Sequence, residues 1–369
     1  MPASKVYFTN MRVVNDENLC DKLVRLCKTA GIGNIDFKDK FTAIKMHFGE
    51  AGNLAFLRAD YARAIVDLVK SLGGKPFVTD CSTLYVGQRK NALDHLDVAY
   101  MHGFNPLSLG CHTIIADGLK GEDDVEVPIN GEYVKSAKIG RTVMEADVFI
   151  SLSHFKGHEG TGFGGALKNI GMGCGSTRGK AEMHESEKPA VHADQCVGCG
   201  VCAENCAHWA INVEEGRAFV NYDRCKGCGR CIGVCPTGAM RPGEEDGCEI
   251  LARKVAEYAY AVCKDRPCFH ITLLIDVSPF CDCYANNDAP VIPDVGMFAS
   301  FDPVALDKAC ADAANKQHVI ADSMLGEKKP LAGMDHFAAM HPDTKWEAGI
   351  EQGERLGLGT SEYELITII

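Results

Sequence analysis

Three features are missing from this sequence, and each absence excludes a class of protein. Basic residues are not in excess, because the formal net charge is −12 at pH 7, which argues against nucleic acid or an anionic membrane surface as the main partner. No run of about 18 apolar residues occurs, so we expect no transmembrane helix. The first residues, MPASKVYFTNMRVV, lack the apolar segment and cleavage site of a secretory signal. We therefore expect a cytoplasmic protein that does not act at a membrane.

Cysteine, by contrast, is abundant, with 19 residues in a chain of 369. A small secreted disulfide scaffold would explain such density, but this chain is large and shows no signal for export. Eight of the cysteines form two sets with the same C-x2-C-x2-C-x3-C spacing. The first set is Cys196, Cys199, Cys202 and Cys206, and the second is Cys225, Cys228, Cys231 and Cys235.

This spacing is typical of two-cluster bacterial ferredoxins, in which the fourth cysteine of each set ligates the cluster of the other set. We therefore expect two [4Fe–4S] clusters as cofactors, whereas a zinc site would need only one group of four ligands. One departure is Ala207, which stands where a proline would follow the first set. The predicted ligands are Cys196, Cys199, Cys202 and Cys235 for one cluster, and Cys225, Cys228, Cys231 and Cys206 for the other.

The rest of the chain alternates strand and helix patterns, which predicts an α/β fold with a mainly parallel sheet flanked by helices. The cysteine-rich segment interrupts this alternation. We therefore expect a small α+β ferredoxin-like module at 190–243, containing a β-hairpin, inserted between the two parts of an α/β domain, 1–189 and 244–369. Strands are predicted at 41–49, 75–81, 111–118, 146–154, 269–278 and 361–369, and helices at 57–73, 89–104, 164–173, 251–263 and 302–316.

A polar, glycine-rich loop, SLSHFKGHEGTGFGGALKN (151–169), connects one of these strands to the next helix. Ligands of open α/β sheets bind beyond the carboxyl ends of strands, and helix N-termini attract anions. Lysine adds positive charge there, and histidine can transfer protons near neutral pH. We therefore predict a site for a small anionic substrate in this crevice. Its candidate catalytic residues are His154, Lys156, His158 and Lys168.

Three other interpretations of this loop stay open. His154 and His158 could instead ligate a metal ion. The glycines at 160, 162 and 165 match G-x-G-x-x-G, but a polar segment separates them from the strand, so a dinucleotide site is only weakly indicated. The loop could also serve packing alone, since glycine often permits close approach of the backbone.

A second group of polar side chains follows the predicted strand 269–278. Cys281 and Cys283 flank Asp282 there, and two thiols with a carboxylate between them can bind a metal ion or contact a substrate. These three residues are further candidates for the catalytic site, and the alternative is a pair of packed thiols. Residues 80–83, at the end of another predicted strand, are candidates for the same crevice.

Several stretches occur in order along the chain: FGEAGN, FVTDCSTLY, IADGLKG, SLSHFKGHEGTGFGGALKNIGMGCGSTRGK, CDC, PVIPDVGMFASFDPVALDKA and LGLGTSEYEL. Together they resemble the family called domain of unknown function 362, in the versions that carry a [4Fe–4S] ferredoxin insert. The resemblance covers nearly the whole chain. It implies the α/β fold and the clusters, and it assigns no activity.

We expect an iron–sulfur oxidoreductase, or a redox subunit, that passes single electrons between an external carrier protein and an anionic substrate in the crevice. One alternative is an electron carrier or assembly partner without chemistry of its own. Another is a non-redox, metal-dependent enzyme with structural clusters, by distant analogy with the loops of nickel-dependent lactate racemases. Candidate side chains that converge on one cavity near a cluster would favour the first hypothesis over the second.

Overall fold

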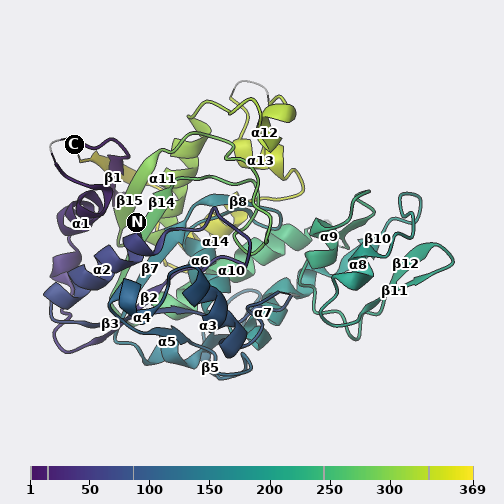
Figure 1. Ribbon diagram of the computed structural model, residues 1–369, viewed down its shortest axis with the longest axis horizontal. Coiled ribbons are helices and arrows are strands. Elements are labelled where there is room, and N and C mark those ends of the chain that lie inside the picture. Colours follow the sequence, from purple (N-terminus) through teal and green to yellow (C-terminus); the bar gives the residue numbers. More distant parts are fainter. Residues whose placement is uncertain (1, 15, 86, 244–245, 331–332, 369) are drawn as a thin grey trace.

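The computed structural model describes residues 2–14, 16–85, 87–243, 246–330 and 333–368. Most of these residues form an α/β body, from one end of which a smaller lobe projects (Figure 1). The body is built on an eight-stranded sheet in which β15 runs antiparallel to both neighbours and the other strands run parallel to one another. The strands, in order across the sheet, are β16 (Tyr363–Thr367), β1 (Ser4–Asn10), β15 (Gly296–Ser300), β14 (Cys268–Leu274), β7 (Val148–His154), β2 (Phe41–Lys45), β3 (Lys75–Asp80) and β4 (Thr113–Ile115).

The predicted mixed α/β fold with a large, mainly parallel sheet flanked by helices is confirmed. Each strand predicted from the sequence overlaps an observed strand, and β16 lies at an edge of the sheet as its alternating pattern indicates. The sequence did not predict β1 and β15, which pair with each other. β15 is short and buried along its whole length, so it lacks the apolar–polar alternation that marks a half-buried strand.

Helices cover both faces of the sheet and bury a separate hydrophobic core on each. Along β7, Phe149 packs into one core whereas Ile150 and Leu152 pack into the other, because successive side chains of a strand point to opposite faces. On one face lie α1 (Leu19–Thr29) and α2 (Ala59–Ser71), with α3 (Ala92–Met101) and α4 (Pro106–Leu109) nearby; on the other lie α6 (Ala166–Cys174), α10 (Gly247–Cys263), α11 (Pro303–Asn315) and α14 (Glu347–Arg355).

Shorter elements connect these layers. Within the described parts of the chain, no helix is both long and apolar enough to cross a membrane. The shorter elements are η1 (Ile32–Asn34), the hairpin of β5 (Asp124–Pro128) and β6 (Ser136–Gly140), α5 (Arg141–Glu145), the hairpin of β8 (Lys156–His158) and β9 (Gly162–Gly164), α7 (Thr177–Met183), η2 (His184–Glu187), α12 (Met324–Glu327) and α13 (His336–Met340).

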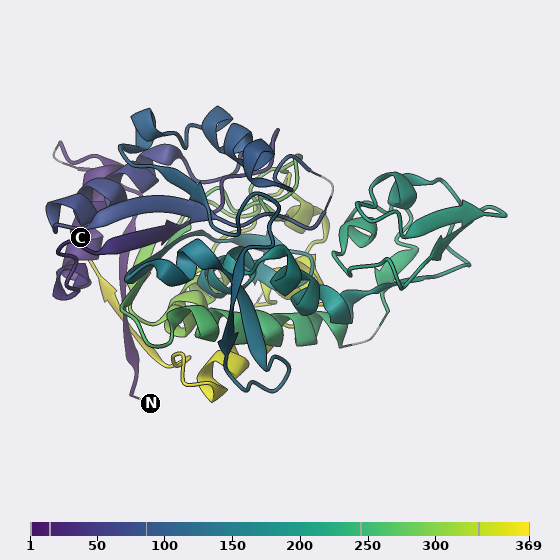
Figure 2. The ribbon, with the colours of Figure 1, turned by 90° about the horizontal axis from the view of Figure 1, so that it is seen from below.

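The lobe leaves the body and returns to it through two paired strands, β10 (Pro189–Val191) and β13 (Met240–Pro242). Figure 2 shows it projecting from the body at the end opposite the labelled termini. Its hairpin, β11 (Ile211–Glu214) and β12 (Arg217–Val220), occupies the predicted place between the two cysteine sets. The lobe also contains α8 (Val201–Glu204), α9 (Arg230–Gly233) and a small core formed by Cys202, Ile211, Ala218, Cys231 and Met240.

Candidate functional site

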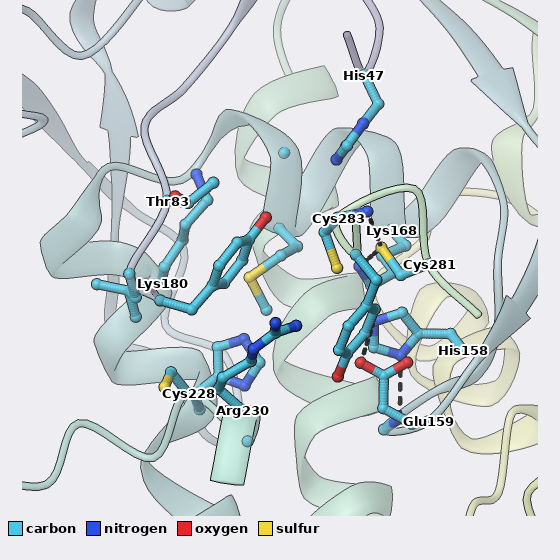
Figure 3. Close-up of a pocket in the computed structure, with 18 of the residues that line it drawn as sticks. His47, Thr83, His158, Glu159, Lys168, Lys180, Cys228, Arg230, Cys281 and Cys283 are labelled. Atoms are coloured by element: carbon cyan, nitrogen blue, oxygen red, sulfur yellow. Dashed lines mark hydrogen bonds and ion pairs between the residues drawn. The ribbon is translucent and has the colours of Figure 1, made fainter. Parts of the chain in front are cut away.

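A cavity of about 120 Å³ lies between the carboxyl ends of the body's strands and the lobe. A buried water needs about 15 Å³ of such space, so the cavity has room for a small organic molecule. The body lines it with residues at or after the carboxyl ends of β2, β3, β7 and β14. The lobe lines it with Ile232 and with Cys228 and Arg230 (Figure 3).

The structure brings five of the seven predicted site residues to this one cavity. They are Lys156, His158, Lys168, Cys281 and Cys283. Of the segment 80–83, Asp80, Cys81 and Thr83 also line it, while the amide and hydroxyl of Ser82 bind the buried Asp117 instead. The remaining two predicted residues, His154 and Asp282, lie behind the cavity wall.

Cys281 lies among groups that favour its ionised form. Its sulfur is 3.8 Å from Lys168 Nζ and accepts a hydrogen bond from the backbone N–H of Cys283 at 3.4 Å. A hydrogen bond from the Cys283 thiol, supported by Lys168 and His158, holds the pKa of Cys281 well below its ordinary value although burial alone would raise it. The same interaction raises the pKa of Cys283. Of the two cysteines, Cys281 is therefore the one whose thiolate these contacts favour.

His158 is held in one orientation by its own loop. Its Nδ1 accepts hydrogen bonds from the backbone N–H groups of Gly160 and Thr161, at 3.0 and 3.1 Å. The ring proton of the neutral form therefore sits on Nε2, which lies 4.0 Å from Glu159 Oε1 and bonds to Cys281. Burial would raise the pKa of Glu159, but His158 lowers it below its ordinary value. This arrangement places a proton donor beside the thiolate.

His154 and Asp282 form a buried pair that supports the site from behind. His154 Nδ1 is 2.9 Å from Asp282 Oδ2, and its Nε2 is 2.8 Å from the carbonyl oxygen of Ile275. Lys156 Nζ lies 3.4 Å from the same carboxylate. Burial would raise the pKa of Asp282, but His154 and Lys156 hold it below its usual range. Both ring nitrogens of His154 thus face protein oxygens, and neither is left for a substrate or a metal ion.

The N-terminus of α6 does not offer its amides to a ligand, which differs from the expectation for the glycine-rich loop. Asp307 of α11 accepts hydrogen bonds from the N–H groups of Ala166 and Leu167 at 2.6 and 2.9 Å. A carboxylate from within the protein therefore fills the place expected for an anion. Burial raises the pKa of Asp307 to about 7, and the two amide bonds only partly oppose this. These two amides are therefore not available to an anion in the cavity.

Several charged residues of the cavity escaped the sequence analysis. Arg89 is 1 % exposed, donates to Glu50 at 3.1 Å and contacts Tyr85. Arg230, within the second cysteine set, stacks its guanidinium over the Tyr284 ring at 4.7 Å, and its buried Nε has no hydrogen-bond partner in the described residues. Arg89 lies in a predicted helix and Arg230 between two cluster cysteines, so neither carried a local signal of its role.

The cysteines of the lobe surround two smaller cavities in the crossed combination expected from the spacing. One cavity is lined by Cys196, Cys199, Cys202 and Cys235, and the other by Cys206, Cys225, Cys228 and Cys231. In each combination the fourth member comes from the other set. Across the described chain, no three His, Cys, Asp or Glu side chains converge as they would on a single metal ion.

Backbone geometry in the lobe directs amides at these sulfurs. The N–H groups of Ala218, Ala210 and Gly227 donate to Cys196, Cys206 and Cys225, at 3.4, 3.3 and 3.4 Å. Gly227 has a φ of 71°, and a Cβ there would collide with the carbonyl oxygen of His184. Only glycine fits this turn, which brings the second set against the body.

Cys228 belongs to both parts of the site. It lines the second cysteine cavity and also the large cavity that contains Cys281 and Lys168. Figure 3 shows Cys228 and Arg230 on the wall formed by the lobe, with Cys281, Lys168 and His158 across from them. Cys199, in the other combination, is exposed on the surface of the lobe. The second cysteine cavity thus adjoins the large cavity, and the first has an exposed cysteine in its wall.

The family described as domain of unknown function (DUF362) matches residues 42–312 of the chain. No curated protein matches it. Among solved structures, the lactate racemase apoprotein from Thermoanaerobacterium thermosaccharolyticum is 11% identical, with a TM-score of 0.32 over 74% of this chain and 51% of that chain. A protein from Thermotoga maritima is also 11% identical, with a TM-score of 0.38 over 93% of this chain and 59% of that chain. This chain thus spans about half the length of the first structure.

Proposed function

The chain belongs to the DUF362 family, whose description assigns no activity, and we propose that it is an iron–sulfur protein that delivers single electrons to a small anionic substrate. In this proposal the lobe at 190–243 is a two-cluster ferredoxin-type module inserted in the α/β domain. An external electron-carrier protein would supply the electrons, and the substrate would bind in the cavity beside Cys281.

The donor set of the lobe fits two [4Fe–4S] clusters. Each cysteine cavity has four thiol ligands in the crossed combination, and N–H groups donate to three of the sulfurs. Such N–H···S bonds stabilise thiolate ligands and raise the potential of a bound cluster. Thiols spread around a cavity suit a cluster, whereas a zinc ion would draw its four ligands to one point. When bound, each cluster would accept and release one electron.

The observation that carries the proposal is the position of Cys228. A ligand of the proposed second cluster forms part of the wall of the large cavity, so electrons would reach a bound substrate without crossing the body. Cys199 is exposed, which supports a first cluster near the surface, where a carrier protein could dock. The convergence of Lys156, His158 and Lys168 on the same cavity favours chemistry there over a role as carrier alone.

The charges of the cavity favour an anionic substrate. Lys45, Arg89, Lys156, Lys168, Lys180 and Arg230 line it, against the carboxylates of Asp80 and Glu159. Some of these cations are already paired: Lys45 Nζ is 3.0 Å from Asp80, and Lys156 is held by Asp282. Two cations keep N–H groups that can donate to a ligand. These are Lys168, whose Nζ lies 3.8 Å from the Cys281 sulfur, and Arg230. His158 Nε2 can supply a proton to it.

Metal and sulfide analysis tests the cluster assignment. Anaerobically purified protein should contain about eight irons and eight labile sulfides per chain, because two complete sets of four cysteines are present. The substitution Cys235→Ser should damage the cluster held by Cys196, Cys199 and Cys202, whereas Cys20→Ser, in the half-buried cysteine of α1, should leave the iron content unchanged. Zinc in place of iron would refute the module, and loss of only the cluster bound by Cys225 and Cys228 would refute the crossed ligation.

A further inference from the structure

We propose that Cys281 and Cys283 form a redox-active dithiol that reduces disulfide bonds, with an anionic low-molecular-weight disulfide as the substrate. This inference rests on the proposed function, because the oxidised pair would need the electrons that the two clusters supply. It adds the class of reaction and the class of substrate.

The geometry of the pair suits thiol–disulfide exchange. One residue separates the two cysteines, and the backbone N–H of Cys283 lies 3.4 Å from the Cys281 sulfur, so side-chain rotation alone would bring the two sulfurs together for an S–S bond. Cys281 has Lys168 Nζ at 3.8 Å and the Cys283 amide at 3.4 Å, and these positive groups stabilise a thiolate, which is the form that attacks a disulfide. Cys283 lies beside it, as a resolving thiol must. Both line the large cavity.

The cycle balances in atoms and electrons. The Cys281 thiolate attacks one sulfur of the substrate, a mixed disulfide forms, and the first product leaves as a thiolate. Cys283 then attacks the mixed disulfide, its proton passes to the second product, and a Cys281–Cys283 disulfide remains. Two electrons and one proton restore the thiolate and the thiol, and two one-electron iron–sulfur centres supply that number of electrons. The sum is one disulfide, two electrons and two protons giving two thiols, once the first product has taken a proton from water.

The cavity selects the charge of the substrate. Lys168 stands beside Cys281, and Arg230 faces the dithiol from the lobe wall with an unpartnered Nε (Figure 3), held in place by stacking on Tyr284. A disulfide that carries carboxylates would meet these cations on either side of the reacting sulfurs. The limited space of about 120 Å³ favours a small molecule over a disulfide within a folded protein.

Mass spectrometry of the trapped intermediate tests this proposal. The Cys283→Ser variant, purified anaerobically, is exposed to dithiodipropionate, an anionic disulfide, and then unfolded in iodoacetamide and digested. We expect a stable adduct on Cys281, and in the unsubstituted protein a disulfide between Cys281 and Cys283. The adduct should form at least about tenfold faster with dithiodipropionate than with the cationic disulfide cystamine, as charge focusing in a cleft implies. The Cys20→Ser variant is the control and should behave as the unsubstituted protein.

The outcomes separate this inference from the proposed function, because iron content and cluster absorbance are measured on the same samples. Intact clusters that accept electrons, together with an unmodified Cys281, would overturn the dithiol and leave the cluster assignment standing. In the unsubstituted protein, an adduct on Cys283 without one on Cys281 would also overturn the dithiol. A Cys281 adduct in protein that lacks iron would support the dithiol and refute the proposed function. In reduced protein with clusters, dithiodipropionate should restore the oxidised visible spectrum, and Cys281→Ser should abolish that reaction.

Discussion

Replacing Lys168 with methionine should raise the pKa of the Cys281 thiol by at least about one unit. Methionine keeps the length of the side chain and removes the ammonium group that lies 3.8 Å from the sulfur. Two unit charges at this distance attract each other by about 4 kcal/mol at an effective dielectric constant of about 20, which corresponds to about three pKa units. That value is an upper bound, because other groups respond when the ammonium is lost.

The groups that remain around Cys281 in the Lys168→Met variant limit how far its pKa rises. Cys283 still donates its hydrogen bond, and it has the largest effect in lowering the pKa. His158 also lowers it, whereas the nearby carboxylate of Glu159 acts in the opposite direction. His47, whose own pKa burial and Arg89 hold well below its ordinary value, stays neutral and contributes little charge. We therefore expect the thiolate to persist in the variant only at higher pH.

The rate of alkylation of Cys281 by iodoacetamide, followed by mass spectrometry across a pH series, measures this shift, because only the thiolate reacts. The matched control is Lys180→Met, since Lys180 lines the opposite side of the cavity (Figure 3) and donates to the carbonyl oxygen of Gly175 at 2.5 Å. In the control, the alkylation rate of Cys281 should depend on pH as it does in the unsubstituted protein. If Lys168→Met also left it unchanged, the ammonium would not stabilise the thiolate and the reasoning would fail.

Three further predictions follow from the same contacts. Asp282→Asn should destabilise the protein by about 3 to 5 kcal/mol, because it leaves His154 and Lys156 without their buried counter-charge, and urea unfolding measures this loss. Folding lowers the pKa of Asp282, so its contribution to the free energy of unfolding is complete when the pH is above the pKa of an unfolded aspartate. This contribution declines as the pH falls below about 4, and the Asp282→Asn variant should lack the decline. Arg230→Met should cost about 1.5 to 3 kcal/mol of binding energy for an anionic ligand, measured by calorimetry, because the buried Nε of Arg230 keeps a donor for it, whereas Lys156→Met should cost less, since Asp282 already holds that ammonium group. Deleting 190–243 and joining the ends with a short linker should leave a folded α/β body, because the chain leaves the body through β10 and returns through β13, which pair with each other. Loss of the near-ultraviolet circular-dichroism signal would contradict this, because that signal reports fixed tertiary packing.

The sequence alone was sufficient for features that depend on local spacing. The apolar periodicity of segments such as 57–73 and 302–316 predicted helices that the structure contains as α2 and α11, because helix periodicity is a property of neighbouring residues. The spacing of the two cysteine sets predicted the crossed groups of four cysteines that line the two small cavities, and that these cysteines ligate clusters stays a prediction. The carboxyl ends of strands also indicated the region where the large cavity lies, since parallel strands bring these ends to one edge of the sheet.

Only the tertiary structure decided which of the candidate side chains act together. Lys168 and Cys281 are 113 positions apart in the chain, and Cys228 comes from a separate lobe, yet all three line one cavity. Asp307 occupies the helix N-terminus that the sequence offered to a ligand, and Asp282 pairs with His154, which removes that histidine from the cavity. Burial and the distances between charges determine these roles. Both depend on how remote segments pack, which the spacing of residues along the chain does not specify.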